Sequence, residues 1–240
     1  MSQRTEQMPE DAKEHYKIKT SIFHSRWYSL SELKKLILFA KDNFIETENK
    51  KITLADFGCG TMPYKSLFDT RKVDYIGIDL DWNPHAQVFI SKDSKILAND
   101  NSYDVVLSTQ VLEHVDDPAG YLKEAYRVLK VGGKLILTTH GYWMYHPDPT
   151  DYWRWTSAGL QKIVKKEGFE ILAFKGMLGR MASGLQLFQD GLIFKFPTWF
   201  RPFISTPMQL LIAFFDMLQR QNVIDMDACN YLIVGKKVNQ

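Results

Sequence analysis

The stretch Lys51-Ile-Thr-Leu-Ala-Asp-Phe-Gly-Cys-Gly-Thr61 decides the fold, because a short apolar run leads directly into a turn with two glycines. Ile52, Leu54 and Phe57 have the composition expected of a strand that is covered on both faces of a parallel sheet. Asp56 interrupts this run, and a carboxylate at the end of a buried strand is costly unless a polar group pairs with it. The segment therefore indicates either a site for a nucleotide-type cofactor or an ordinary strand-to-loop turn.

The composition is that of a globular protein with one domain. Hydrophobic residues make up 45% of the 240 residues and charged residues 24%, and the net charge of +2 argues against a nucleic-acid partner. Only Cys59 and Cys229 are present, so no disulfide framework is implied and a cytoplasmic location is expected. The polar residues 1–9 lack the apolar core of a signal peptide.

Strands and helices are expected to alternate along most of the chain. Ser29 and Glu32 fit a capping box that opens a helix reaching about Phe44. The aromatic and basic residues 15–28 before it either pack on this helix or form a lid over the site. Further strands are expected at residues 75–79, 86–90, 103–108, 134–139, 169–174 and 230–234, and helices at 63–68, from 118 to the glycines at 132–133, at 157–167 and from 206 onward.

This alternation predicts right-handed β-α-β units and an α/β fold with a doubly wound, mostly parallel sheet. In such sheets a ligand binds beyond the carboxyl ends of the strands, where the winding reverses. Asp56, Asp79, Thr109, Gln110 and His140 are all expected at that edge.

Asp79 ends the second expected strand, roughly twenty residues beyond the glycines, where an acidic side chain can bind both ribose hydroxyls of an adenosine. Asp81 competes for this assignment. Asp79 alternatively begins a surface turn.

Four motifs in order resemble those of class I S-adenosylmethionine-dependent methyltransferases. They are Ala-Asp-Phe-Gly-Cys-Gly at 55–60, Tyr-Ile-Gly-Ile-Asp at 75–79, the segment 103–115 ending in Val-Leu-Glu-His-Val, and the helix and strand of 121–137. The resemblance implies a Rossmann-like sheet of seven strands whose last two are antiparallel, with S-adenosyl-L-methionine as cofactor. The cofactor-binding residues that it implies are Asp56, Gly58, Cys59 and Gly60 near the methionine part, Asp79 and Leu80 at the ribose, Asp93 or Ser94 near the adenine, and Thr109 and Gln110 lining the site.

One position separates this cofactor from a nicotinamide dinucleotide. A dinucleotide site requires a third glycine for close packing beside the pyrophosphate, and this chain has Pro63 there. A methyl donor has no phosphates, so the substitution favours the sulfonium cofactor. Many class I members also have a glycine where this chain has Met62.

The resemblance implies in-line attack of an acceptor atom on the activated methyl group, and a hydroxyl acceptor also needs a base. His114, His140 and His146 are the candidate catalytic residues, because only histidine has an unperturbed pKa near neutrality. Each could instead be a structural histidine. The aromatic loop that contains His146 is interpreted as the acceptor pocket wall, or as a cover over the sheet edge, and no metal site is expected. The candidate acceptor-binding residues are Tyr145, Asp151, Tyr152, Trp153 and Arg154.

The chain is divided into an N-terminal helical segment at 1–45, a possible lid, and a methyltransferase domain at 46–240 with an apolar helical insertion at 177–227. The uncharged run in this insertion is too short to cross a membrane. Its apolar residues, within 185–218, could contact a second copy, a lipid-linked acceptor or the bilayer surface, or could pack on the domain itself.

The acceptor is expected to be a small molecule or glycan-type molecule methylated on oxygen. Residues 151–156 and the insertion resemble bacterial methyltransferases associated with surface-polysaccharide synthesis. Quinone or lipid methylation is the alternative within enzymes, and a non-catalytic protein that binds the cofactor for regulation or scaffolding is the alternative outside them.

Overall fold

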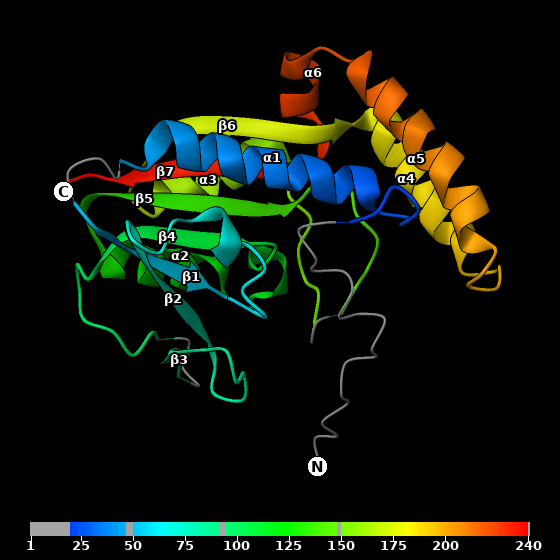
Figure 1. Ribbon diagram of the computed structural model, residues 1–240. Coiled ribbons are helices and arrows are strands. Elements are labelled where there is room, and N and C mark those ends of the chain that lie inside the picture. The colour runs from blue at the N-terminus through cyan, green and yellow to red at the C-terminus, as the bar shows by residue number, and fades with distance from the viewer. Residues whose placement is uncertain (1–19, 47–49, 92–94, 148–149, 240) are drawn as a thin grey trace.

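A computed structural model describes residues 20–46, 50–91, 95–147 and 150–239 of the chain. Its centre is a seven-stranded sheet in the order β3-β2-β1-β4-β5-β7-β6 (Figure 1). The strands are β1 Ile52–Phe57, β2 Val73–Leu80, β3 Val88–Ile90, β4 Tyr103–Thr109, β5 Leu129–His140, β6 Phe169–Gly179 and β7 Ala228–Lys237. The helices are α1 Trp27–Phe44, α2 Pro118–Val128, α3 Ser157–Lys166, α4 Arg180–Ile193, α5 Arg201–Met217 and α6 Gln221–Met226, with short 3-10 helices η2 Lys65–Leu67 and η3 Leu112–His114.

The sheet confirms the predicted doubly wound topology. Strands β1 to β5 pair in parallel, whereas β7 is antiparallel to both β5 and β6. The chain winds from β1 through β2 to β3 on one side and then returns to β4 on the other side of β1. The winding therefore reverses between β1 and β4, which places the candidate ligand edge at the carboxyl ends of these two strands.

Both faces of the sheet are buried by helices, as the apolar composition of β1 predicts (Figure 1). Leu54 of β1 packs in one cluster with Leu33 and Ile37 of α1. Ala55, the next residue, faces the opposite cluster, which contains Leu122 of α2. Alternate residues of one strand therefore hold the helical layers on the two sides of the sheet.

Two predicted helix starts are confirmed by their caps. Asp117 accepts a hydrogen bond from the Gly120 N–H at 3.0 Å, with Pro118 in the first turn of α2. Thr156 accepts one from the Gly159 N–H at 3.1 Å at the start of α3.

The predicted capping box of the first helix is wrong. Helix α1 begins at Trp27, so Ser29 lies inside its first turn and donates to the Arg26 carbonyl. The Tyr28 N–H donates instead to the side-chain oxygen of Gln209, at 2.8 Å, from helix α5. A side chain distant in the sequence thus accepts a hydrogen bond of the kind that a local cap was expected to accept.

The second helix ends earlier than predicted, at Val128 rather than at the glycine pair. Residues 132–133 lie inside β5, next to an irregularity in its pairing with β4. A Cβ at Gly133 would lie 2.7 Å from the Lys130 carbonyl oxygen, so glycine is needed there for close strand packing and not for a helix stop.

The predicted insertion lies between β6 and β7 and consists of helices α4, α5 and α6 (Figure 1). Strand β6 continues to Gly179, so the helices begin at Arg180. Helix α5 starts before the predicted Thr206, with Pro202 in its first turn and Pro207 in its interior. Among the described residues, no helix combines the length and apolar character that a membrane-spanning segment requires.

Candidate functional site

The glycine turn after β1 leaves backbone open toward the ligand edge. The N–H groups of Gly58 and Cys59 both donate to the Ile78 carbonyl, at 2.8 and 3.2 Å, which fixes the turn against β2. Gly58 has φ +78° and Gly60 has φ +50°, in the left-handed region that favours glycine. A Cβ at Gly58 would lie 2.6 Å from the Val111 side chain, whereas a Cβ at Gly60 would meet no described atom within 4 Å. The Gly60 backbone therefore faces open space in which a ligand can approach.

Asp56 presents a carboxylate oxygen that is not satisfied by the described protein atoms. The residue is 1% exposed, and the Tyr75 hydroxyl donates to its Oδ2 at 2.6 Å. Its Oδ1 is buried and has no hydrogen-bond partner among the residues that the structure describes. Burial raises the pKa of Asp56 to about 7, against a lowering by the Tyr75 hydrogen bond and a further rise from the nearby Asp79 charge. A cationic or hydrogen-bond-donating ligand would relieve this unsatisfied acceptor.

Asp79 is bonded to the glycine turn, whereas the competing Asp81 is exposed. Oδ2 of Asp79 accepts hydrogen bonds from the Gly60 N–H at 2.9 Å and from the Asn83 amide at 2.6 Å. Its Oδ1 accepts one from the Leu80 N–H at 2.8 Å. The side chain remains partly exposed at the edge of the sheet, so it orders the turn and still faces solvent.

Thr109 ends β4 on the other side of the reversal point, and Gln110 follows it. Gln110 has φ +56°, a strained conformation for a residue with a side chain, and strain of this kind collects at functional sites. Its amide donates to Oγ1 of Thr138 at 3.1 Å, and its buried Oε1 has no partner within the described parts of the chain. Gln110 and Asp56 thus each leave one acceptor unpaired. The predicted adenine-side residues Asp93 and Ser94 lie outside the described residues.

A second polar cluster lies where η3, the end of β5 and the following loop meet. Glu113 is fully buried, and Oγ1 of Thr139 donates to its Oε2 at 2.8 Å. Oε1 of Glu113 lies 3.2 Å from Nε2 of His140 without forming a hydrogen bond to a described atom. Burial raises the pKa of Glu113 to about 7. Burial, with a smaller effect of the His146 charge, lowers the pKa of His140 well below its usual value, so this ring is neutral.

The structure brings the three candidate catalytic histidines together. The ring of His146 meets those of His114 and His140 edge-on, each at a centroid distance of 4.9 Å. His140 stacks on Trp143 at 5.0 Å, and the guanidinium of Arg26 lies 4.7 Å from the same Trp143 ring. Arg26, just before α1, therefore reaches the cluster, although the proposed lid role of residues 1–45 stays a prediction.

Two of the candidate acceptor-binding residues are engaged in holding the loop. Arg154 forms a two-point ion pair with Asp151, whose Oδ2 also accepts a hydrogen bond from the His146 N–H at 2.8 Å. The N–H groups of Tyr152 and Trp153 donate to the Glu113 carbonyl at 2.8 and 3.2 Å. The loop is therefore fixed directly onto η3.

Three aromatic side chains of this loop are exposed, of which Trp153 also donates a hydrogen bond from its Nε1 to the Val115 carbonyl at 2.8 Å. Tyr145 is 70% exposed, Tyr152 52% and Trp153 39%. Their contact with an acceptor stays a prediction.

Three residues of the site were missed by sequence reasoning. Tyr75 lies inside a strand and Asn83 in a turn, and neither has a local signal of its bonding partner. Glu113 could have been found from the sequence, since it is an acidic residue within the apolar run Val-Leu-Glu-His-Val. Burying a carboxylate in such a run is costly unless a partner compensates it.

Comparison with known proteins supports the predicted class. The model of the family described as "Methyltransferase domain" matches residues 24–173, which is more than half of the chain. A thiol S-methyltransferase of Rattus norvegicus is 32% identical over 136 residues, which cover 48% of this chain and 54% of that protein. A ubiquinone biosynthesis O-methyltransferase of Pseudomonas aeruginosa is 28% identical over 139 residues, 50% of this chain and 59% of that protein. The match thus spans little more than half the length of these curated relatives.

Solved structures share the fold at low sequence identity. The cyclase SpnF has a TM-score of 0.58 at 18% identity, covering 89% of this chain and 83% of its own. A phosphoethanolamine N-methyltransferase 2 of Haemonchus contortus, in complex with S-adenosyl-L-methionine, has a TM-score of 0.54 at 19% identity, covering 86% of this chain and 53% of its own. At these identities the likeness shows the fold alone.

Proposed function

Because the chain belongs to the methyltransferase domain family, we propose that it transfers a methyl group to oxygen of a small-molecule or glycan-type acceptor. The predicted class, an S-adenosylmethionine-dependent methyltransferase, and its methyl donor are confirmed at the level of the family. The observation that carries the choice of acceptor atom is the buried Glu113–histidine cluster beside the ligand edge. An alcohol is far less acidic than a thiol, so oxygen is the acceptor that most needs such a cluster.

The residues at the sheet edge fit the methyl donor. Its ammonium group is a cation and its ribose hydroxyls are donors, and the edge offers the unpaired Oδ1 of Asp56 and Oε1 of Gln110. Asp79 is the candidate for the ribose, and the open space at Gly60 admits the ligand next to backbone. When bound, the cofactor supplies a methyl group on a positively charged sulfur, which an acceptor attacks in line.

The protein's own contribution is to position the acceptor and remove its proton. Burial lowers the pKa of His146, so its ring is largely neutral at pH 7 and can accept a proton. Asp151 lies 3.2 Å from Nδ1 of His146 and favours the charged form of the ring. Holding acceptor and methyl in line can contribute on the order of 7 to 11 kcal/mol. The histidine cluster is therefore the proposed exit for the acceptor proton.

A glycan-type acceptor is supported by the likeness of residues 151–156 to methyltransferases of surface-polysaccharide synthesis and by the exposed aromatic side chains of the loop. The relatives that act on a thiol and in ubiquinone biosynthesis supply the competing acceptor classes.

Transfer of labelled methyl from S-adenosylmethionine to panels of sugars, quinols and thiols tests the proposal. Labelled methyl ethers of a hydroxylated acceptor are expected. Transfer only to thiols would reject oxygen, and cofactor binding without any labelled product would favour a non-catalytic role.

We also propose that the hairpin of α4 and α5 rests on an anionic membrane surface. In this hairpin the buried face is largely polar and the exposed face is apolar, which is the opposite of an ordinary water-soluble helix pair. Its buried positions are largely polar, with amide side chains of Gln186, Gln189 and Gln209 all donating to the Ser25 carbonyl. Its outer face is apolar. The exposed apolar residues are Met181, Leu187, Phe188, Phe194, Trp199, Phe200, Phe203, Leu210, Leu211, Phe214, Met217 and Leu218.

Charge at the tip of the hairpin favours a membrane over a second copy of the chain as the partner of this face. Between residues 191 and 215 the ionisable side chains are Lys195 and Arg201, both basic. Trp199 is 72% exposed and Phe203 69% exposed beside them. Aromatic and basic side chains together favour the interface of an anionic bilayer.

Sedimentation with phosphatidylglycerol-containing vesicles tests this placement. Trp199→Ser and Phe203→Ser should each weaken binding by about tenfold, since burying such a ring contributes about 1.5 kcal/mol or more. Leu97→Ser, at another residue that is 66% exposed, is the matched control. If the protein does not bind vesicles but forms a dimer at higher concentration, the apolar face is an interface with a second copy and not with a membrane.

A further inference from the structure

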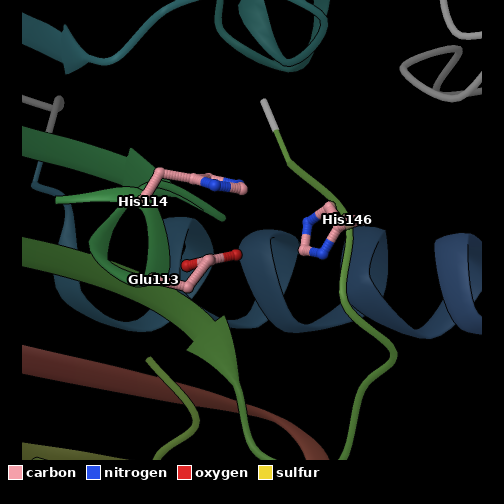
Figure 2. A group of neighbouring side chains, drawn as sticks. All are labelled: Glu113, His114 and His146. Atoms are coloured by element: carbon pink, nitrogen blue, oxygen red, sulfur yellow. The ribbon is translucent and has the colours of Figure 1, made fainter. Parts of the chain in front are cut away.

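Glu113, His114 and His146 form a group in which one ligand atom of each side chain lies within 4.8 Å of the other two (Figure 2). The first two belong to η3, and His146 comes from the loop after β5. Figure 2 shows the three side chains converging from these two segments. The same loop is held onto η3 by the Tyr152 and Trp153 backbone, so the convergence is built into the fold.

Both imidazoles have one nitrogen engaged by the protein. Nδ1 of His114 hydrogen-bonds with the Thr150 carbonyl. Nδ1 of His146 lies 3.2 Å from Oδ2 of Asp151. Nε2 is thereby left as the ring nitrogen available to a ligand in each case. Histidines that bind metals are held in this way, with the second nitrogen bonded to a carbonyl or a carboxylate.

The carboxylate in this group is buried and incompletely satisfied. Glu113 is 0% exposed and its Oε2 is held by Thr139. Its Oε1 is among the buried atoms that lack a hydrogen-bond partner in the described structure. Burying such an oxygen is costly unless a donor or a cation compensates it. This oxygen is independent evidence for a ligand, because packing of the histidine rings does not require it.

We propose that Glu113, His114 and His146 bind a divalent transition-metal ion of the Zn²⁺ type. Two imidazoles with one carboxylate suit such ions, whereas Mg²⁺ and Ca²⁺ prefer oxygen ligands alone. Zinc lies about 2.0 to 2.2 Å from nitrogen and oxygen ligands, so the three side chains would rotate to bring their ligand atoms, which lie within 4.8 Å of one another, onto the ion. His140, 3.2 Å from Glu113, stands beside the carboxylate as a positioning residue.

Three protein ligands leave a coordination position open, as in catalytic zinc sites. An acceptor oxygen at that position would lose its proton more readily and be held in a fixed direction. This role rests on the proposed function: the ion, in place of a free imidazole, would promote loss of the acceptor proton, which would pass to solvent. The binding of the ion itself does not depend on methyl transfer.

Metal binding by the tag-free full chain tests the proposal without any cofactor or acceptor. Protein stripped with a chelator is titrated with Zn²⁺ against a chromogenic competitor, and Co²⁺ is used to record ligand-field absorption. One equivalent should bind. His114→Ala and His146→Ala should each weaken binding at least tenfold, and Asp151→Asn should weaken it ten- to a hundredfold by loosening His146.

His85→Ala is the matched control, because it removes an exposed histidine outside the group and should leave the titration unchanged. Circular dichroism and thermal melting identify any variant that is unfolded. Equal Zn²⁺ affinity in wild type, His114→Ala and His146→Ala would overturn the site. Intact Zn²⁺ binding without methyl transfer to any acceptor would instead overturn the proposed function.

Discussion

Oδ1 of Asp56 has no hydrogen-bond partner among the described residues, and this predicts that S-adenosylmethionine binding is coupled to the release of a proton. In the free protein the pKa of Asp56 is raised to about 7, chiefly by burial. A cationic ligand beside its Oδ1 favours the ionised form, so binding should release a proton below pH 7. The affinity should therefore rise with pH.

The size of the effect follows from the fraction of protein that is competent to bind. With a pKa of about 7, roughly a tenth of Asp56 is ionised at pH 6 and roughly nine tenths at pH 8. If the ligand binds the ionised form alone, the apparent Kd falls about tenfold between these pH values, a change of about 1.4 kcal/mol.

Isothermal titration calorimetry in buffers of different ionisation enthalpy measures both the affinity and the protons released. Asp56→Asn keeps the shape of the side chain and removes the titration, so its affinity should be weaker and should no longer vary with pH. Asp81→Asn, an exposed acid at the same edge, is the control and should behave as wild type. The reasoning is refuted if wild type binds equally at pH 6 and pH 8, or if Asp56→Asn keeps the wild-type pH dependence, which would assign the titration to another group.

Three further outcomes can be measured on the same protein. Asp79→Ala should weaken cofactor binding at least tenfold, about 1.4 kcal/mol, in calorimetry, because it also frees the Gly60 N–H and the Asn83 amide; unchanged affinity would remove Asp79 from the ribose. His146→Ala should slow turnover and leave cofactor affinity intact, and full activity would show that the acceptor proton leaves elsewhere. In urea unfolding, Asp56 makes the free protein less stable as pH rises from about 4 to about 7, since the folded carboxyl keeps its proton to higher pH than the unfolded one. In Asp56→Asn the free energy of unfolding should fall less over this pH range. An identical fall in both proteins would contradict the assignment of the raised pKa to Asp56.

The parts of the fold that the sequence predicted are those set by neighbouring residues. The apolar run before Gly58 and the helix start at residue 118 follow from local patterns, and the structure has the strand and the helix start where they were expected. The start of α1 could not be predicted in this way. Its N–H partner, Gln209, lies 181 residues away, so the capping residues near Ser29 were a poor guide.

In the candidate site, too, the features set by local sequence could be predicted and those set by distant contacts could not. The histidines could be chosen by residue type, but their contact depends on the loop after β5 folding back onto η3. The apolar character of the insertion was evident from composition, whereas the inward orientation of its glutamines was not. The buried amides of Gln186 and Gln189 are satisfied by partners distant in the sequence, because the Ser25 carbonyl accepts from both and the Gln209 amide donates to both.

The segment from Val111 to Glu113 connects the two halves of the site. Val111 limits the space at Gly58, where a Cβ would come within 2.6 Å of its side chain. Two residues later, Glu113 holds the loop after β5 through its backbone carbonyl, and its side chain lies beside His140. The glycine turn and the loop after β5 therefore both contact the same three-residue segment, so we expect a shift of the turn to disturb the packing of that segment and the contacts of the loop.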